Sequence, residues 1–235
     1  MSTCLSCHSP FFQEVSIQSL FSLKQSPLCM KCSSQLMLCQ DGCIRCGKPT
    51  RFGSFIEEEC RDCIWWRKLL GQDVLQRNQS LYEYNDFLKT LLSTYKFRGD
   101  VAIGHIFTES LLKIISEHDQ QFVVTTVPLS PLRMKERGFN QADELLKRGQ
   151  IHHCLMRIST DDNRKQSKKT RYERINLYQH NPFSPIPEEK SYIKGKKYLI
   201  IDDIYTTGVT VRMAAKALLE SGAESVSSLT VARAI

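Results

Sequence analysis

The sequence predicts an α/β protein with a mostly parallel, doubly wound sheet that follows a small cysteine-rich module. Nine of the ten cysteines lie before residue 64. From about residue 80, segments typical of strands alternate with segments typical of helices, the pattern of a parallel sheet. A late strand runs into two aspartates and a Thr/Gly-rich turn. We therefore divide the chain into a module at 1–66, a linker or helix at 67–79 and an α/β domain at 80–235.

The cysteine-rich module is expected to be held together by metal, because it has little regular periodicity and can bury only a small core. The N-terminus has neither the basic nor the apolar region of a signal peptide, and no apolar run approaches the roughly 18 residues of a membrane span. We therefore expect a cytoplasmic protein. Cytoplasmic thiols are kept reduced, so paired cysteines are more often metal ligands than disulfides.

The cysteines of the module form four CxxC pairs, namely Cys4/Cys7, Cys29/Cys32, Cys43/Cys46 and Cys60/Cys63. Two such turns complete a tetrahedral site, so we predict two structural Cys4 zinc sites. Consecutive pairing is the simplest arrangement, and a cross-brace stays open. The alternative is reduced pairs without metal, or a redox CxxC, which normally occurs singly. Cys39 is a spare that could replace Cys43, and Cys154 is predicted to be a small core residue.

The elements of the α/β part follow from apolar periodicity and β-branched runs. Helical spacing of apolar residues predicts the first two helices, and a β-branched run predicts the buried strand that follows them. A polar, basic loop is expected at 160–170 and a proline-bearing connector at 184–191. The expected strands are 80–84, 122–127, 155–158, 198–201 and 225–232, and the expected helices are 85–97, 101–117, 140–147, 171–177 and 209–220.

The segment 197–210 combines a buried strand, an acidic pair, a Thr/Gly-rich turn and the start of a helix. A helix N-terminus offers unpaired N–H groups to a phosphate, and Gly208 lets the backbone approach it. Asp202 and Asp203 are expected at the carboxyl end of the strand, where open α/β sheets bind ligands. Carboxylates accept hydrogen bonds from sugar hydroxyls, so the segment indicates a ribose grip beside a phosphate cradle. The alternative is an ordinary strand, turn and helix with a threonine N-cap and no ligand. It does not explain two carboxylates at the end of a buried strand, because buried carboxylates need partners.

This segment resembles the phosphoribosyl-pyrophosphate (PRPP) motif of type I phosphoribosyltransferases. The resemblance implies that Asp202 and Asp203 bind the ribose hydroxyls, and are catalytic if the site is active, and that Mg²⁺ accompanies PRPP. The loop after strand 122–127 would hold the pyrophosphate, although Lys135 could equally belong to a solvated basic face. Lys165 would belong to a mobile loop that closes over PRPP. The basic run at 165–174, which includes Lys168, Lys169 and Arg171, could instead contact nucleic-acid phosphates or be an ordinary exposed charge run. The implied PRPP-binding residues are Asp202, Asp203, Thr206, Thr207, Gly208, Val209, Thr210, Ser130, Arg133, Arg137 and Lys165.

Three further strings extend the resemblance to nearly the whole chain: YKFRGD at 95–100, PLSPLRMKERGFNQA at 128–142 and KQSKKTRYERIN at 165–176. With the cysteine pairs, they resemble the ComF competence family, in which a double zinc ribbon precedes a type I phosphoribosyltransferase-like domain. Members act in natural transformation, the uptake of single-stranded DNA, with a cytoplasmic ATP-driven DNA translocase. The resemblance implies a cytoplasmic protein that is recruited to the inner face of the membrane at the uptake machinery.

Three functional hypotheses stay open at this point. The first is a DNA-uptake protein that binds single-stranded DNA and carries a PRPP site. The alternative is an active phosphoribosyltransferase with an unidentified acceptor, although no base-binding hood follows the last expected strand. The third is a scaffold whose zinc module docks the translocase. The net charge of +7 permits phosphate-rich partners without requiring them.

Overall fold

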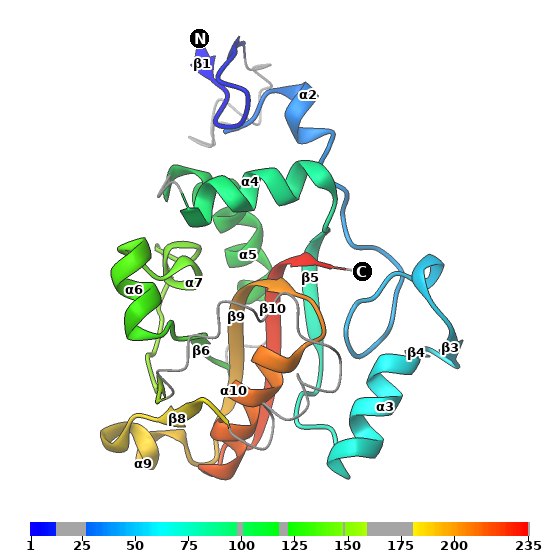
Figure 1. Cartoon of the computed structure of the whole chain (residues 1–235), viewed down its shortest axis with the longest axis vertical. Coiled ribbons are helices and arrows are strands. Elements are labelled where there is room, and N and C mark those ends of the chain that lie inside the picture. Colours follow the sequence, from blue (N-terminus) through cyan, green and yellow to red (C-terminus); the bar gives the residue numbers. More distant parts are fainter. Residues whose placement is uncertain (13–26, 98–100, 118–121, 148, 159–180, 235) are drawn as a thin grey trace.

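The computed structural model describes residues 1–12, 27–97, 101–117, 122–147, 149–158 and 181–234. Its centre is a four-stranded sheet in the order β5 (Asn78–Glu83), β10 (Ser225–Arg233), β9 (Lys197–Tyr205) and β6 (Phe122–Thr126) (Figure 1). Every pairing in this sheet is parallel. Within the described ranges, no helix combines the length and the hydropathy of a membrane span.

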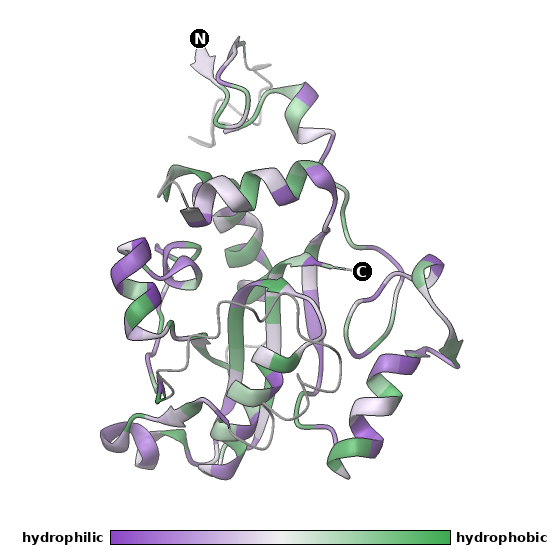
Figure 2. Cartoon of the chain, in the orientation of Figure 1, coloured by the Kyte–Doolittle hydropathy of each residue, from purple (hydrophilic) through white to green (hydrophobic). Residues whose placement is uncertain are grey.

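Both faces of the sheet are covered, which explains why β9 reads as a continuous apolar run. Leu199 and Ile201 pack into one cluster, with α4 (Asp86–Phe97) and α5 (His105–Glu117). Tyr198 and Ile200 point to the opposite face and pack with α10 (Val209–Glu220). The apolar residues of the central strands and of the inner helix faces stand out in Figure 2. The predicted doubly wound α/β fold is therefore confirmed.

Within the residues that the structure describes, the cysteine-rich part contains two small hairpins and two helices. The hairpins are β1 (Ser2–Thr3) with β2 (Pro10–Phe11) and β3 (Phe55–Ile56) with β4 (Glu59–Cys60). The helices are α2 (Met30–Ser33) and α3 (Arg61–Leu70), with the short 3₁₀ turn η1 (Thr50–Phe52) between them. Gly71 ends α3 in the left-handed conformation that glycine adopts most readily. The division at residues 66 and 80 stays a prediction.

Several elements differ from the expected ones at their ends. The second helix begins with the 3₁₀ turn η2 (Val101–Gly104), and α7 (Gln141–Glu144) is shorter than predicted. The segment expected as a connector contains β8 (Phe183–Pro185), η4 (Pro187–Glu189) and α9 (Lys190–Ile193). β8 forms an antiparallel hairpin with β7 (Leu155–Arg157). The expected loop at 160–170 and helix at 171–177 lie outside the described residues.

The largest difference concerns β9, which does not end at residue 201. Its pairing with β10 continues through Ile204 opposite Ala232 and Tyr205 opposite Arg233. Its pairing with β6 stops where Thr126 lies opposite Ile201. The acidic pair is therefore part of an extended strand with a neighbour on one side only, because β10 is longer than β6.

Candidate functional site

The one-sided pairing of β9 leaves space beyond the end of β6. A cavity of about 500 Å³ lies there, between the end of β9, the turn before α10 and the loop after β6. This is the crevice outside the carboxyl ends of parallel strands where open α/β sheets bind ligands. The polar and charged residues that line it are Lys96, Arg133, Arg137, Asn140, Gln141, Arg157, Asp202, Asp203, Thr206, Thr207 and Thr210.

The turn between β9 and α10 is shaped by Gly208. Its φ of 76° lies in the left-handed region, and a Cβ atom there would collide with the side chains of Arg212 and Tyr205. Gly208 is buried and shapes the cavity without lining it, whereas Thr206, Thr207, Val209 and Thr210 all line it. The N-terminus of a twelve-residue helix thus opens onto the cavity, which suits an anion.

The acidic pair precedes this turn, in the last part of β9. Asp202 Oδ1 accepts a hydrogen bond of 2.9 Å from the backbone N–H of Asp203, and the Asp203 carboxylate forms an ion pair of 2.5 Å with Lys96 Nζ. Burial raises the pKa of Asp202 to about 7, and the negative charge of Asp203 adds to the rise. Lys96 and Arg137 act in the opposite direction. Asp202 therefore ionises near neutral pH, at a cost to the folded state.

The raised pKa of Asp202 predicts that Asp202→Asn stabilises the protein at alkaline pH. In the unfolded chain this carboxyl ionises near pH 3.8, whereas in the folded protein it ionises near pH 7. Between these two pH values the carboxyl is ionised in the unfolded chain but still protonated in the folded protein. The contribution of Asp202 to the free energy of unfolding therefore falls as pH rises through this range and stays low above pH 7. We expect the melting temperature of the asparagine variant to match that of wild type near about pH 4 and to exceed it near about pH 8. A constant difference across this range would contradict the raised pKa.

Capping residues set the ends of the two short helices that follow β6. Ser130 is the N-cap of α6 (Pro131–Arg137), and its hydroxyl accepts a hydrogen bond of 3.2 Å from the backbone N–H of Arg133. Gly138 ends that helix with a φ of 77°, and Asn140 caps α7. These caps fix α6 in the position from which Arg133 and Arg137 line the cavity. Ser130 itself is buried and is not among the lining residues.

The structure adds residues that the sequence analysis did not assign to the site, above all Lys96 and Asn140. Both belong to the strings that carried the family resemblance, which is the signal that could have identified them. The segments 95–100 and 128–142, which contain these two residues, are in contact. The Tyr95 hydroxyl donates a hydrogen bond of 2.7 Å to the Gln141 carbonyl, and the ring centroids of Tyr95 and Phe139 lie 5.7 Å apart. Arg157 joins them from β7. Lys165 lies outside the described residues.

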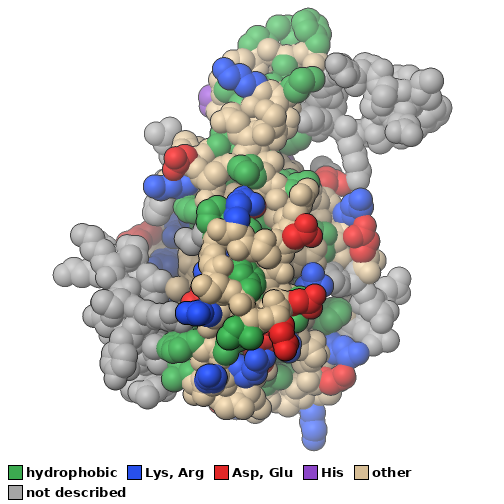
Figure 3. All heavy atoms as spheres, turned by 90° about the vertical axis from the view of Figure 1, so that its right-hand side faces the viewer, with side chains coloured by type: hydrophobic (Ala, Val, Ile, Leu, Met, Phe, Trp, Pro, Cys, Tyr) green, Lys and Arg blue, Asp and Glu red, His purple; other side chains and the backbone are tan. Residues whose placement is uncertain are grey.

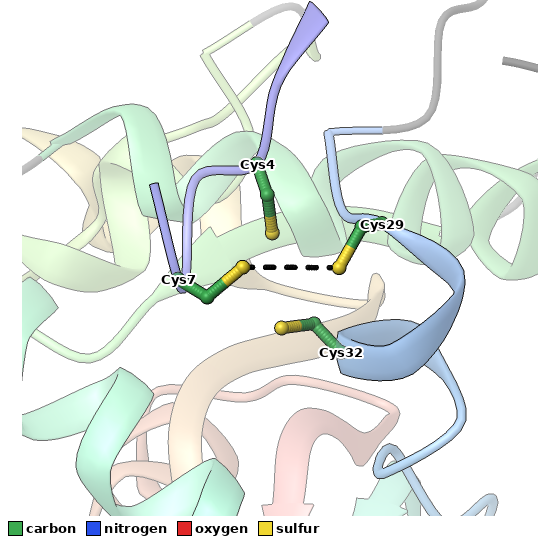
Figure 4. Close-up of side chains that lie close together, drawn as sticks. All are labelled: Cys4, Cys7, Cys29 and Cys32. Atoms are coloured by element: carbon green, nitrogen blue, oxygen red, sulfur yellow. Dashed lines mark hydrogen bonds between the residues drawn. The ribbon is translucent and has the colours of Figure 1, made fainter. Parts of the chain in front are cut away.

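The first cysteine cluster consists of Cys4, Cys7, Cys29 and Cys32, whose side chains point toward one another (Figure 4). Their sulfur atoms all lie within 4.8 Å of one another, and Cys7 Sγ is 3.8 Å from Cys29 Sγ. A tetrahedron with Zn–S bonds near 2.3 Å has sulfurs about 3.8 Å apart, so these residues fit zinc. Cys7 is exposed, and the cluster packs against Phe87 and Ile106 beside α4 and α5.

The second cluster consists of Cys43, Cys46, Cys60 and Cys63, all of them buried in the core that contains α10. Cys46 Sγ and Cys60 Sγ lie 3.6 Å apart, and the backbone N–H of Cys60 donates to Cys43 Sγ at 3.2 Å. The CxxC pairs therefore group consecutively, and both groups could bind zinc. Cys39 belongs to neither cluster, and burial raises the pKa of its thiol to about 11. Cys154 is fully buried, as predicted for a core residue.

Comparisons with known proteins agree with this architecture. The sequence model of the family described as "Phosphoribosyl transferase domain" matches residues 135–235. Competence protein ComFC of Bacillus subtilis (strain 168) is 41% identical to this chain, over 98% of the chain and 94% of that protein. The chain belongs to the ComF family of competence proteins. Competence protein ComFC of Streptococcus pneumoniae (strain ATCC BAA-255 / R6) is 32% identical, over 98% of this chain and 99% of that protein.

Among solved structures, a hypoxanthine phosphoribosyltransferase from Staphylococcus aureus aligns with 56% of this ComF chain and 72% of its own, at 18% identity and a TM-score of 0.34. Family membership and the matched domain confirm the predicted combination of a type I phosphoribosyltransferase-like sheet with a cysteine-rich zinc-ribbon module. They also support a role of this ComF protein in competence.

Proposed function

We propose that this ComF protein acts in the cytoplasm during DNA uptake, binds single-stranded DNA and uses its cavity to bind PRPP. The observation that carries the PRPP proposal is the cavity itself. It combines a pair of carboxylates, the N-terminus of α10 and the side chains of Arg133 and Arg137. A sugar with phosphates at both ends needs these three kinds of group together. Family membership supports the DNA-uptake part of the proposal.

The proposed ligand matches the polarity of each part of the cavity. The carboxylates of Asp202 and Asp203 would accept hydrogen bonds from the ribose hydroxyls, and the turn at 206–210 would surround the 5-phosphate. The two arginines of α6 would hold the pyrophosphate, together with Mg²⁺, which binds substrate phosphates while retaining several waters. Lys96, paired with Asp203 in this structure, can exchange that partner for a phosphate within the same cavity.

Among the surfaces that the structure describes, we expect DNA to bind at the edge of the cavity. On the side of the molecule that carries β3, β4 and α3, acidic and basic side chains are interspersed (Figure 3). Such a mixture does not attract a polyanion strongly. The cavity edge instead brings Lys96, Arg133, Arg137 and Arg157 together from three segments of the chain, α4, α6 and β7. The phosphates of a DNA backbone would be attracted most strongly to these four basic side chains.

We expect binding of a labelled single-stranded oligonucleotide to weaken as salt increases, because phosphate contacts release counterions. The double variant Arg133→Gln/Arg137→Gln should flatten the plot of log affinity against log salt by about 0.7 for each lost contact. The control Arg51→Gln/Arg67→Gln removes the same charge from two arginines that do not line the cavity and that pair with Glu83 and Glu59. Fluorescence anisotropy measures both. Equal slopes in the two variants, or binding that is indifferent to salt, would refute the proposed DNA surface.

The sequence suggests a second set of DNA contacts, although it lies outside the described residues. Replacing Lys165, Lys168, Lys169 and Arg171 should flatten the salt slope further. Titration of the DNA complex with PRPP and Mg²⁺ then tests whether the two ligands share the cavity edge. Competition supports a shared site, whereas independent binding separates the DNA surface from the cavity.

We further propose that the protein cooperates with an ATP-driven DNA translocase at the inner face of the membrane, as the family resemblance implies. A deletion strain that transforms at the normal frequency would contradict the role in DNA uptake.

The alternative is an active phosphoribosyltransferase with an unidentified acceptor. It is favoured by the match of residues 135–235 to the phosphoribosyl transferase domain and by the complete acidic pair. Phosphoribosyl transfer requires positioning and a metal on the pyrophosphate more than a dedicated protein base. Pyrophosphate release from PRPP that depends on an added acceptor would favour the enzyme. Binding without release would favour a ligand site that controls DNA binding.

A further inference from the structure

Two fully buried arginines lie between the second cysteine cluster and the turn that precedes α10. Arg212 is 1% exposed and Arg233 is 3% exposed. A buried guanidinium is costly unless an opposite charge lies close to it. The ion pairs with carboxylates found in the described part of the chain involve other basic residues. The charge of Asp73 also acts on Arg212, but without an ion pair, so the negative charge in contact with these two arginines comes from a different kind of group.

The cysteine sulfurs are that group. Arg233 Nη2 lies 3.4 Å from Cys46 Sγ, and its Nε donates to the Cys46 carbonyl at 3.0 Å. Arg212 Nη2 lies 3.8 Å from Cys63 Sγ. A zinc ion with four thiolates carries a net charge of −2, because 2 − 4 = −2, and the two guanidiniums carry +2. Each arginine thus contacts one CxxC pair, and together they neutralise the occupied site.

The same two arginines also hold the turn. Arg233 Nη1 donates to the carbonyls of Tyr205 at 3.3 Å and Thr206 at 2.9 Å, and Arg212 Nη1 donates to the Tyr205 hydroxyl. The next carbonyl, that of Thr207, accepts a hydrogen bond of 3.0 Å from Trp66 Nε1, three residues beyond Cys63. Three consecutive carbonyls of the turn are therefore anchored by groups that lie against the second cluster.

We propose that Arg212 and Arg233 are the counterions of a zinc tetrathiolate at the second cluster, and that this pairing makes the order of the turn at 205–208 depend on metal occupancy. When the zinc ion leaves and the four sulfurs take up protons, the site becomes neutral. The two guanidiniums then lose the opposite charge that stabilises them in their buried positions, and their hydrogen bonds to the turn weaken. The first cluster packs beside α4 and α5, so its metal should not affect the turn. The inference does not depend on what the cavity binds.

The first test measures the zinc affinity of both sites by competition with a chromophoric chelator. Arg233→Gln and Arg212→Gln should each lower the zinc affinity of one of the two sites by about 10- to 100-fold, as the loss of a group that supports metal ligands does. Lysine at either position keeps the charge and should recover part of the affinity. Arg67→Gln is the matched control, because Arg67 lies on α3 next to Trp66 but pairs with Glu59. Wild-type affinity in both buried-arginine variants would overturn the proposal.

The second test needs no substitution at the arginines, so it holds even if those variants fold poorly. A chelator removes zinc stepwise from the protein, and hydrogen exchange is followed at two amides that donate to carbonyls of the turn. These are the amide of Ala234, which donates to the Tyr205 carbonyl at 2.9 Å, and the amide of Arg212, which donates to the Gly208 carbonyl at 3.0 Å. Loss of the zinc from the second cluster should raise exchange at these two amides while the middle of β10 stays protected. Cys7→Ser empties the first site selectively and should leave the turn as protected as in wild type. Unchanged exchange at the amides of Ala234 and Arg212 after complete zinc removal would refute the coupling.

Discussion

Replacing Asp202 and Asp203 together by asparagine is expected to abolish most of the PRPP affinity of this protein. Both carboxylates line the cavity, and the ribose hydroxyls of the proposed ligand have no other acidic partner among its described lining residues. A hydrogen bond to a charged group contributes about 1.5–3 kcal/mol, so the double variant should lose about 100-fold or more in affinity. Calorimetric titration with PRPP in the presence of Mg²⁺ measures this loss.

Two controls separate a lost ligand contact from a damaged fold. Asp86→Asn removes an exposed carboxylate from the first turn of α4, away from the cavity lining, and should bind PRPP as wild type does. The melting temperature of the double variant should not fall near neutral pH, because the buried charge of Asp202 is removed. A folded double variant with wild-type PRPP affinity would show that the acidic pair does not grip the ligand.

The second large effect is expected from the cysteines, and it should differ between the two clusters. The purified protein should contain about two zinc ions per chain. Cys46→Ser and Cys7→Ser should each release one of them. Cys46 is buried in the core that holds α10, whereas Cys7 is exposed. We therefore expect Cys46→Ser to lower the melting temperature by about 10 °C or more, at about 2–4 °C for each kcal/mol lost. Cys7→Ser should have a much smaller effect.

Metal analysis and thermal unfolding followed by near-ultraviolet circular dichroism distinguish the two variants. The tryptophan signal should respond to Cys46→Ser, because Trp66 belongs to the same buried cluster as Cys46. Zinc content near zero in wild type, with every thiol open to titration, would refute both metal sites. Equal destabilisation by the two variants would contradict the different burial of the clusters.

The sequence by itself determined the features that depend on local patterns. The spacing of the CxxC pairs predicted two four-cysteine groups, because each such turn directs two sulfurs to one point. Short β-branched and apolar runs predicted the buried strands, since a strand that is covered on both faces needs apolar side chains at successive positions. The turn at 206–210 was recognisable because glycine and threonine before a helix are a local pattern typical of anion sites. None of these requires a contact between distant parts of the chain.

Only the tertiary structure decided which distant residues meet. The ion pair of Lys96 with Asp203 and the stop of β6 opposite Ile201 depend on the register and length of parallel strands that lie far apart in the sequence. The consecutive grouping of the cysteines was one of two arrangements allowed by their spacing. The two arginines were unremarkable in the sequence, because the pattern of α10 and β10 does not show that Arg212 and Arg233 face the cysteines. Their role depends on burial, which removes water and makes a neighbouring opposite charge necessary.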